Sequence, residues 1–296
     1  MQGLILKGIG GFYYVKTEKG IVEAKGRGIF KKNDSKLMVG DNVLIELLDE
    51  KPETEGIDLK GVINEILPRK NSFIRPPIVN VDTFVITFAC KDPEPNFVLI
   101  DKFLIMAEMN NVEAIIVMNK CDLVSDEIVN EYRAIYEKVY PVIEASSVNG
   151  RGMDELKKLI SSKRVSFAGP SGVGKSTIIN NLIPEAEMET GMISSKTKRG
   201  KHTTRHVEIF EAEGGGLVFD TPGFTSFEIM EADEDNLQDF FPEIEKLKGK
   251  CYYDNCKHLK EPDCVVKQAV REGKINRKRY ESYKFILDEI KNNKRY

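Results

Sequence analysis

Between residues 81 and 223, short apolar segments alternate with longer segments in which apolar residues recur at helical spacing. Short apolar segments bounded by turn residues are typical of buried strands, and longer periodic segments are typical of amphipathic helices. We expect strands over residues 83–89, 113–118, 140–144, 165–168 and 216–219. We expect helices over residues 99–109, 126–136, 154–160 and 175–182. This alternation predicts an α/β domain with a mostly parallel sheet.

The two ends of the chain have different patterns. Near the N-terminus, turn residues separate short alternating segments over residues 11–15, 21–24, 41–46 and 61–63. Such segments predict a small β-barrel of the OB-fold type. A proline-containing linker is expected at residues 69–77, and the chain from about residue 226 is predicted to be helical. The chain of 296 residues is long enough for three domains, over residues 1–68, 69–225 and 226–296.

The composition is that of a soluble globular protein, with 41% hydrophobic and 31% charged residues. No apolar run approaches a membrane span, and the N-terminus lacks the basic and apolar regions of a signal peptide. We therefore expect a cytoplasmic protein without a membrane partner. A net charge of −3 does not indicate nucleic acid, although residues 265–296 hold ten Lys/Arg and four Asp/Glu. That stretch fits a phosphate contact or a solvated helix face, and taken alone it favours the second.

Residues 169–176 fit the pattern G-x-x-x-x-G-K-S of a phosphate-binding P-loop. The apolar strand before the loop and the helix after it would aim backbone N–H groups and a helix N-terminus at a phosphate. Lys175 would contact the β- and γ-phosphates, and the Ser176 hydroxyl would ligate Mg²⁺. The alternative is a glycine-rich turn without a ligand, which the order of strand, loop and helix disfavours. The expected nucleotide contacts are Gly169, Pro170, Ser171, Gly172, Val173, Gly174, Lys175, Ser176 and Thr177.

A tetrapeptide typical of guanine recognition, Asn119-Lys120-Cys121-Asp122, follows the second expected strand. The Asp122 carboxylate can accept two hydrogen bonds from guanine, whereas adenine offers no matching pair of donors. Asn119 can support the loop and the base edge, and the stem of Lys120 can cover the face of the ring. The tetrapeptide alone is weak evidence, and it gains weight because a P-loop accompanies it.

Two further segments complete the set of nucleotide motifs. A D-x-x-G motif at residues 220–223 follows an apolar strand, so Asp220 would hold Mg²⁺ through water and the Gly223 N–H would contact the γ-phosphate. An ordinary turn after a strand is the alternative, and only the neighbouring motifs argue against it. Ser146 and Ser147 follow another strand and are placed to offer backbone N–H groups to the guanine carbonyl, unless they form a simple loop.

The segment between the P-loop and Asp220 is polar and rich in lysine, as is typical of a mobile switch. A threonine there would complete the Mg²⁺ shell, with Thr204 favoured over Thr203, unless the segment is only a solvated loop. Phe224 follows the D-x-x-G motif, so no glutamine stands there to orient the attacking water. His202 would orient the water instead, or is a surface histidine. Slow intrinsic hydrolysis that a partner stimulates is the natural inference.

Three of the five cysteines lie near a histidine in the C-terminal part. Three thiolates and one imidazole suit tetrahedral Zn²⁺, and a complete set of four protein ligands indicates one structural ion. Disulfides are the alternative, but an odd number of cysteines and a cytoplasmic chain disfavour them. The expected zinc ligands are Cys251, Cys256, His258 and Cys264. The other two cysteines, Cys90 and Cys121, are interpreted as isolated thiols near strand ends.

The motifs occur in a rotated order, because Asn119 comes 50 residues before Gly169 whereas a P-loop normally opens its domain. In this order the chain resembles the circularly permuted GTPases of small-ribosomal-subunit biogenesis, ribosome small-subunit-dependent GTPase A. The resemblance covers nearly the whole chain. Its further marks are the barrel, residues 68–71, 80–82 and 200–204, Phe224 and the zinc ligands. One departure is Ala145, where Ser or Thr is more familiar, but backbone groups should act there.

The resemblance implies an OB-fold barrel, a permuted P-loop GTPase domain and a helical zinc domain. It implies a late-acting factor, which we expect to be a monomer, that binds the 30S subunit in its GTP state. The barrel and the zinc domain would contact 16S ribosomal RNA. The subunit would stimulate hydrolysis of GTP, bound with Mg²⁺, to GDP and phosphate, after which the factor dissociates. Because the chain enters the zinc domain soon after Gly223, loss of the γ-phosphate could pull on that domain and set its affinity for RNA.

Two other functional classes remain to be weighed. A P-loop ATPase or kinase is opposed by the guanine-recognition tetrapeptide. A non-enzymatic RNA-binding scaffold would use GTP only to hold its shape. Multiple-turnover phosphate release, with and without 30S subunits, separates such a scaffold from an enzyme.

Overall fold

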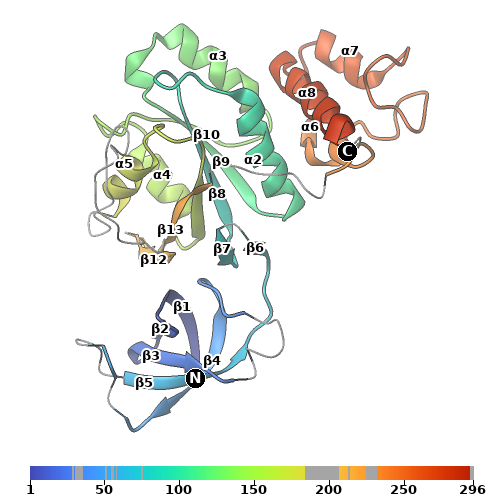
Figure 1. Cartoon of the computed structure of the whole chain (residues 1–296). Helices are drawn as coiled ribbons and strands as arrows, with labels where there is room; N and C mark the ends of the chain where they lie inside the picture. The colour runs from blue at the N-terminus through green and yellow to red at the C-terminus, as the bar shows by residue number, and fades with distance from the viewer. Residues whose placement is uncertain are drawn as a thin grey trace.

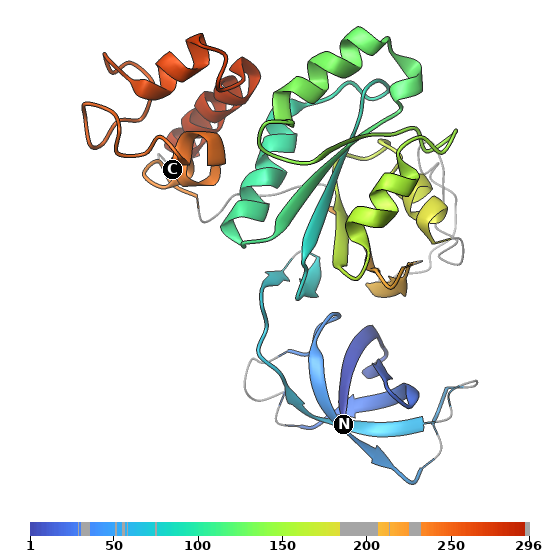
Figure 2. The same cartoon turned by 180° about the vertical axis from the view of Figure 1, so that it is seen from behind.

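The computed structural model describes residues 1–28, 30, 36–50, 52–54, 57, 59–74, 76–183, 207–212, 214–224 and 232–293. A barrel of strands, a central α/β part and a C-terminal helical part follow one another along the chain (Figure 1). The helical part lies beside α2 (Phe97–Met109), and the opposite view in Figure 2 shows the same arrangement. The multidomain α/β fold expected from the sequence is confirmed. Among the described residues, no helix has the length and apolar character needed to cross a membrane.

Five strands form the N-terminal barrel: β1 (Gln2–Ile9), β2 (Phe12–Thr17), β3 (Gly20–Gly26), β4 (Asn42–Leu48) and β5 (Leu59–Ile66). They pair in the order β1-β2-β3-β5-β4, and β4 also pairs with β1, so the sheet closes on itself. Fully buried aliphatic side chains fill the interior, among them Ile5, Val15, Val22, Val43 and Ile63. The sequence pattern did not predict β1, because Gly3 and Gly8 weaken its strand propensity.

The central sheet runs in the order β10-β9-β8-β11-β13-β12. Its strands are β8 (Thr83–Ala89), β9 (Glu113–Asn119), β10 (Val142–Glu144), β11 (Arg164–Ala168), β12 (Glu208–Glu211) and β13 (Leu217–Phe224). Neighbouring strands are parallel except for the antiparallel pair β12 and β13. Parallel neighbours place their carboxyl ends at one edge of the sheet, so the loops that follow β8, β9, β10 and β11 meet there.

Helices cover both faces of this sheet. α2 and α3 (Asp126–Tyr136) pack on one face, and α4 (Met153–Ile160) and α5 (Lys175–Leu182) pack on the other. Successive residues of β8 alternate between the two cores, with Phe84 on the side of α2 and Val85 on the side of α4. Strands buried on both faces are apolar throughout, which is why the hydrophobic pattern predicted them.

The barrel and the central sheet form one hydrogen-bonded ladder. β12 pairs with β13 on one side and with β1 on the other, where Lys7 lies opposite Glu208. These two side chains also form an ion pair, with 2.7 Å between Lys7 Nζ and Glu208 Oε2. At the same junction, Arg164 Nη2 donates to Asn42 Oδ1 at 2.8 Å. Gly40 has a φ of +96° and is packed so closely that a Cβ would clash, so the contact between the two parts requires glycine here.

The segment expected to be a linker, residues 69–77, is partly regular. β6 (Ser72–Ile74) and β7 (Pro77–Val79) pair as a small antiparallel sheet. Asn71 connects the start of this small sheet with the main chain of Val81. Its Nδ2 donates to Val81 O at 2.8 Å, and its Oδ1 accepts from Val81 N at 2.9 Å. The prolines in this segment masked the strands in the sequence pattern, since proline lowers strand propensity.

The C-terminal part consists of η3 (Leu237–Phe240), α6 (Pro242–Glu245), α7 (Val265–Arg271) and α8 (Arg277–Asn293). Its core continues onto α2, where buried Ile105 packs with it. Within this interface, Arg279 Nη1 donates to Asp101 Oδ1 at 2.6 Å, and Arg279 Nε donates to Glu243 Oε1 at 2.7 Å. The arginine therefore links α8 and α6 to α2 of the central part through buried charges.

Candidate guanine-nucleotide site and zinc cluster

Three glycines let the loop between β11 and α5 turn tightly. The φ angles of Gly169, Gly172 and Gly174 are +140°, +78° and +95°, which glycine adopts with little strain. A Cβ on Gly169 would lie 2.0 Å from the carbonyl oxygen of Thr87, and a Cβ on Gly174 would lie 2.3 Å from Asn119 Nδ2. The loop packs against the ends of β8 and β9 because these positions carry no side chain.

Lys175 is the first residue of α5 and folds back over the loop. Its Nζ donates to the carbonyl oxygens of Gly169 at 2.8 Å and Pro170 at 2.6 Å. Burial lowers the pKa of Lys175 to about 8. A phosphate beside this ammonium would oppose that effect, because an opposite charge favours the charged form. The remaining polar side chains of the motif are exposed or partly buried: Ser171, Ser176 and Thr177.

Asn119, at the end of β9, connects the P-loop with the loop that follows β10. Its side chain is fully buried, and its Nδ2 donates to Val173 O at 2.8 Å and to Ser147 Oγ at 3.3 Å. Its Oδ1 accepts from Ser147 N at 3.0 Å. The neighbouring Lys120 Nζ donates to Gly172 O at 2.9 Å. Three motifs that are separate in the sequence are therefore joined by direct hydrogen bonds.

The other expected base contacts differ in accessibility. Asp122 lies on the short turn η1 (Cys121–Leu123) with an exposed side chain. Ser146 is fully buried, and its N–H donates to Arg151 O at 3.1 Å. The N–H of Ser147 is likewise given to an internal acceptor. A base carbonyl at this loop would therefore have to share N–H groups that already have partners.

Asp220 lies in β13, which runs parallel to the strand that leads into the P-loop. The D-x-x-G motif belongs to β13 rather than to a turn after it, and the pairing with β11 is irregular at residues 220–223, between the pairs Ser166–Phe219 and Ala168–Phe224. Burial raises the pKa of Asp220, and the charge of Glu208 raises it further. A bound cation would relieve this accumulation of negative charge. The carboxylate of Asp220 and the hydroxyl of Ser176 are oxygen donors of the kind that suit Mg²⁺.

The expected switch falls outside the described residues. His202, Thr203 and Thr204 all lie in the interval between residues 183 and 207. The backbone of Gly223 and Phe224 is part of β13.

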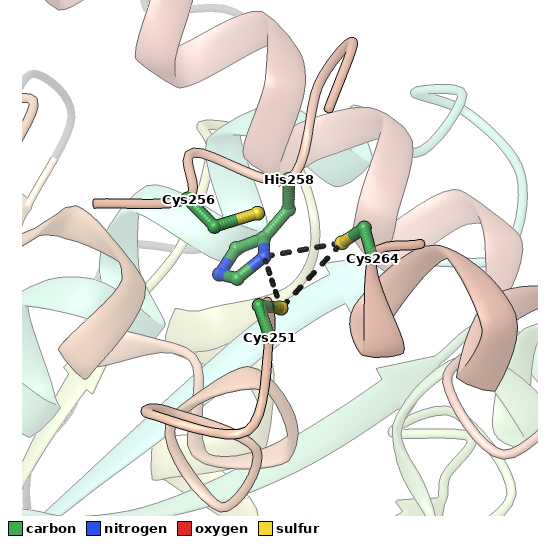
Figure 3. Close-up of side chains that lie close together, drawn as sticks. All are labelled: Cys251, Cys256, His258 and Cys264. Carbon is green, nitrogen blue, oxygen red and sulfur yellow. Dashed lines mark hydrogen bonds between the residues drawn. The ribbon is translucent and has the colours of Figure 1, made fainter. Parts of the chain in front are cut away.

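Four side chains of the C-terminal part meet in one small cluster (Figure 3). The donor atoms of Cys251, Cys256, His258 and Cys264 lie within 4.8 Å of one another, and three of the four side chains are buried. His258 Nδ1 lies 3.3 Å from Cys264 Sγ and 3.7 Å from Cys251 Sγ, and the two sulfurs are 3.9 Å apart. Zinc–sulfur and zinc–nitrogen bonds of ordinary length in a tetrahedron require donor separations of about 3.6–3.8 Å. The cluster therefore fits one structural zinc ion.

A second residue orients the histidine of this cluster. His258 Nε2 lies 3.0 Å from Gln238 Oε1, so a ring that uses Nδ1 for a metal can donate its other N–H to this amide oxygen. Gln238 lies on η3, and this contact could not be predicted from the sequence because the two residues share no motif. Contacts of this kind fix the tautomer and the orientation of a ligating ring.

The prediction of two isolated thiols is wrong. Cys90 Sγ and Cys121 Sγ lie 3.6 Å apart, and both side chains are buried. The parallel pairing of β8 and β9 causes the encounter, because Ala89 and Asn119 are opposite each other in register. The sequence interval of 31 residues hid this contact, since it depends on which strands are neighbours.

Family comparisons agree with the rotated order of these elements. Residues 66–230 match the family model described as RsgA GTPase, and residues 2–56 match that of the RsgA N-terminal domain. The chain belongs to the RsgA GTPase family. The small ribosomal subunit biogenesis GTPase RsgA of Alkaliphilus metalliredigens is 46% identical over 296 residues, covering 100% of this chain and 99% of the relative. The RsgA of Clostridium beijerinckii is 46% identical over 292 residues, covering 98% and 97%.

Solved structures of the RsgA family share the fold over the whole chain. YjeQ from Thermotoga maritima superposes with a TM-score of 0.79 at 34% identity, covering 98% of both chains. YloQ, described as a circularly permuted GTPase, gives a TM-score of 0.80 at 36% identity, covering 99% of this chain and 95% of that one. The family and the permuted fold that the sequence suggested are confirmed. As an RsgA family member, the chain is a GTPase.

Proposed function

We propose that this GTPase acts in the maturation of the small ribosomal subunit, binding the 30S particle in its GTP state and leaving it after hydrolysis. The proposal is supported by the relatives, which are named small ribosomal subunit biogenesis GTPases. In the chain itself, the nucleotide-binding part of the proposal is carried by Asn119, which bonds the P-loop at Val173 and the serine loop at Ser147. One buried amide thereby holds the phosphate-binding and base-binding segments in a fixed relation.

Guanine specificity is assigned to Asp122, with Asn119 and Lys120 holding its loop. The exposed carboxylate would accept hydrogen bonds from N1–H and the exocyclic amine of guanine. The adenine of ATP would offer that carboxylate no matching pair of hydrogen-bond donors, which disfavours the binding of ATP. Ser146 and Ser147 complete the base pocket, with Ser147 held by Asn119.

Phosphate binding is assigned to the P-loop residues 169–177. Lys175 would exchange its two carbonyl partners for the β- and γ-phosphates and stabilise the charge that develops on the γ-phosphoryl oxygens. The Gly223 N–H would contact the γ-phosphate. Binding would hold the buried lysine in its charged form to higher pH, because anionic oxygens raise an ammonium pKa.

Magnesium with GTP would be held by Ser176, Asp220 and Thr204. When bound, the ion would supply charge neutralisation of the phosphate oxygens. Ser176 offers its hydroxyl from the first turn of α5, and Asp220 offers a carboxylate from the neighbouring strand. His202 would orient the attacking water, since Phe224 occupies the position after the D-x-x-G motif.

We assign three domains to the chain, over residues 1–68, 69–225 and 226–296. The barrel and the zinc domain would contact 16S ribosomal RNA of the 30S subunit. The zinc ion, held by Cys251, Cys256, His258 and Cys264, would stabilise a segment too small to fold on a hydrophobic core alone. The protein would act as a cytoplasmic monomer without a membrane partner.

Phosphate release under multiple turnover, with and without 30S subunits, tests this function. We expect slow release alone and strong stimulation by the subunit, and Lys175→Ala should abolish both. Asp122→Asn should weaken GTP binding and favour binding of xanthosine triphosphate. Xanthine carries a carbonyl where guanine has its exocyclic amine, and the amide can donate a hydrogen bond to it. The control is Asp126→Asn, which changes another exposed acid near the same loop and should leave the preference for GTP unchanged.

The coupling of nucleotide and subunit is tested by affinity. The full chain should bind 30S subunits more tightly with a non-hydrolysable GTP analogue than with GDP, and by linkage the subunit should tighten GTP binding by the same factor. Deleting residues 231–296 should remove stimulation but keep intrinsic hydrolysis. Equal subunit affinities in the two nucleotide states would contradict the coupling, and unstimulated turnover would leave only a GTP-binding scaffold.

A further inference from the structure

Two thiols are in contact beside the loop assigned to guanine recognition. Cys90 directly follows β8, and Cys121 is the third residue of the tetrapeptide that contains Asp122. Their sulfurs are 3.6 Å apart, and Cys90 N donates to Asn119 O at 2.8 Å, so the main chains beside both thiols are fixed. Two thiols in contact at the edge of a parallel sheet can form a disulfide after small rotations of their side chains.

The two thiols differ in their readiness to ionise. The hydrogen bond from Cys90 lowers the pKa of Cys121, and a backbone hydrogen bond from Ala145 to this side chain lowers it further. The same contact raises the pKa of Cys90, together with burial. Because the thiolate is the nucleophile, one thiol of the pair can attack an oxidant and the other, in contact with it, can resolve the product.

Oxidant access requires only a short path. The side chains of Cys90 and Cys121 are 1% and 3% exposed, but the next residues in the chain, Lys91 and Asp122, are exposed. The pair therefore lies one residue below the surface, where a small peroxide can reach it through local opening of either loop.

We propose that Cys90 and Cys121 are a redox modification site that forms a reversible disulfide and weakens guanine-nucleotide binding; this rests on the proposed nucleotide site. The oxidant is a hydroperoxide such as hydrogen peroxide. The thiolate of one cysteine attacks one oxygen of hydrogen peroxide and breaks the O–O bond, giving a sulfenic acid and, after proton transfer, one water. The thiol of the other cysteine then loses its proton and attacks the sulfenic sulfur, and the hydroxide that leaves takes up this proton to give the second water. Two thiols and one peroxide thus give one disulfide and two waters, with two electrons passed to the peroxide.

Disulfide formation must move the recognition loop. A sulfur–sulfur bond is about 2.05 Å long, so the sulfurs must approach by about 1.5 Å from their present contact. Cys90 is anchored to the β8 end of the ladder, whereas Cys121 must also give up the hydrogen bond from its Sγ to Met118 O at 3.0 Å. Asp122 is the next residue and moves with it. We expect a loss of about tenfold in affinity, which corresponds to one weakened charge-assisted hydrogen bond.

The test uses the zinc-loaded full chain, reduced and then titrated with hydrogen peroxide. Peptide mass spectrometry identifies a Cys90–Cys121 crosslink, and a fluorescent GDP analogue measures affinity before oxidation, after oxidation and after treatment with a dithiol reductant. A chromogenic chelator reports any zinc release, and peroxide concentrations that oxidise the zinc thiolates are excluded from the comparison. The matched variants are Cys90→Ala and Cys90→Ser, which keep Cys121 and all zinc ligands.

We expect the crosslink and the drop in GDP affinity in the wild-type chain, recovery with the reductant, and neither effect in the variants. Absence of the crosslink while zinc is retained would overturn the site, leaving two packed thiols. A crosslink without any change in GDP affinity would overturn the regulatory effect. Failure of the reduced wild-type chain to bind GDP would instead count against the nucleotide site itself, so the two failures are distinguishable.

Discussion

Replacing Arg279 by methionine should strongly destabilise the C-terminal part. Arg279 is 1% exposed, and its guanidinium joins Asp101, which is 0% exposed, and Glu243, which is 10% exposed. Its Cζ also lies 4.7 Å from the ring centre of Phe241. Methionine would fill most of the volume but would leave two carboxylates buried without their cation. Arg279→Met therefore tests whether buried charge pairs hold the zinc domain on α2.

The magnitude follows from the burial of the partners. Removing one member of a buried ion pair costs about 3–5 kcal/mol, because an uncompensated charge remains. Burial already raises the pKa of Asp101, with Arg279 opposing the rise, so loss of the guanidinium should drive this carboxyl to take up a proton. An exposed pair on the same helix, Arg277 with Glu281 at 2.9 Å, should be worth only about 0.3–0.5 kcal/mol.

Urea unfolding of zinc-loaded protein measures both variants, with far-UV circular dichroism for the whole chain and chelator-detected zinc release for the C-terminal part. Arg277→Met is the matched control on α8. Combining Arg279→Met with Asp101→Leu and Glu243→Leu should recover much of the loss, since replacing all buried charges by apolar groups is often neutral. Equal stability of Arg279→Met and Arg277→Met would refute the reasoning. A triple variant as unstable as the single one would assign the loss to packing.

Three further predictions concern the two sites. Gly174→Ala should weaken GDP binding at least about tenfold, because its Cβ would meet Asn119 Nδ2 at 2.3 Å; unchanged binding of a fluorescent GDP analogue would contradict this. Gln238→Leu should lower zinc affinity about 10–100-fold in chelator competition, whereas the exposed Gln268→Leu should not change it; equal effects would exclude an orienting role. GDP binding should take up protons above pH 8 and not well below it, because Lys175 has a pKa of about 8 when free and phosphate raises it. Calorimetry in buffers of different ionisation heat measures this uptake, and identical heats above pH 8 would contradict it.

Elements with strong hydrophobic patterns could be predicted from the sequence with accurate bounds. β8, α3 and α5 begin and end where the pattern placed them, because a strand buried on both faces and an amphipathic helix each carry a clear period. β1 and the pair β6 and β7 were missed, because glycine and proline obscure the strand signal although tertiary pairing still forms strands there.

Contacts across the fold were the less predictable part of the site. The zinc donors share one short segment, so their residue types and spacing already indicated a cluster. Gln238, Arg279 and the contact of Cys90 with Cys121 depend on which elements become neighbours, and no local pattern records that choice. The roles assigned to individual nucleotide-binding residues stay predictions, although Asn119 joins their loops.

The strand β12 determines what kind of signal the barrel can receive. It is the only strand between β13, which carries Asp220, and β1 of the barrel within the described ladder. Side chains alternate between the two faces of a strand, so β12 cannot slide by one residue without turning its buried face outward. A displacement at Asp220 therefore either leaves the register of β12 intact or breaks the ladder. The barrel would respond to events at the phosphate site in discrete steps rather than in proportion to them.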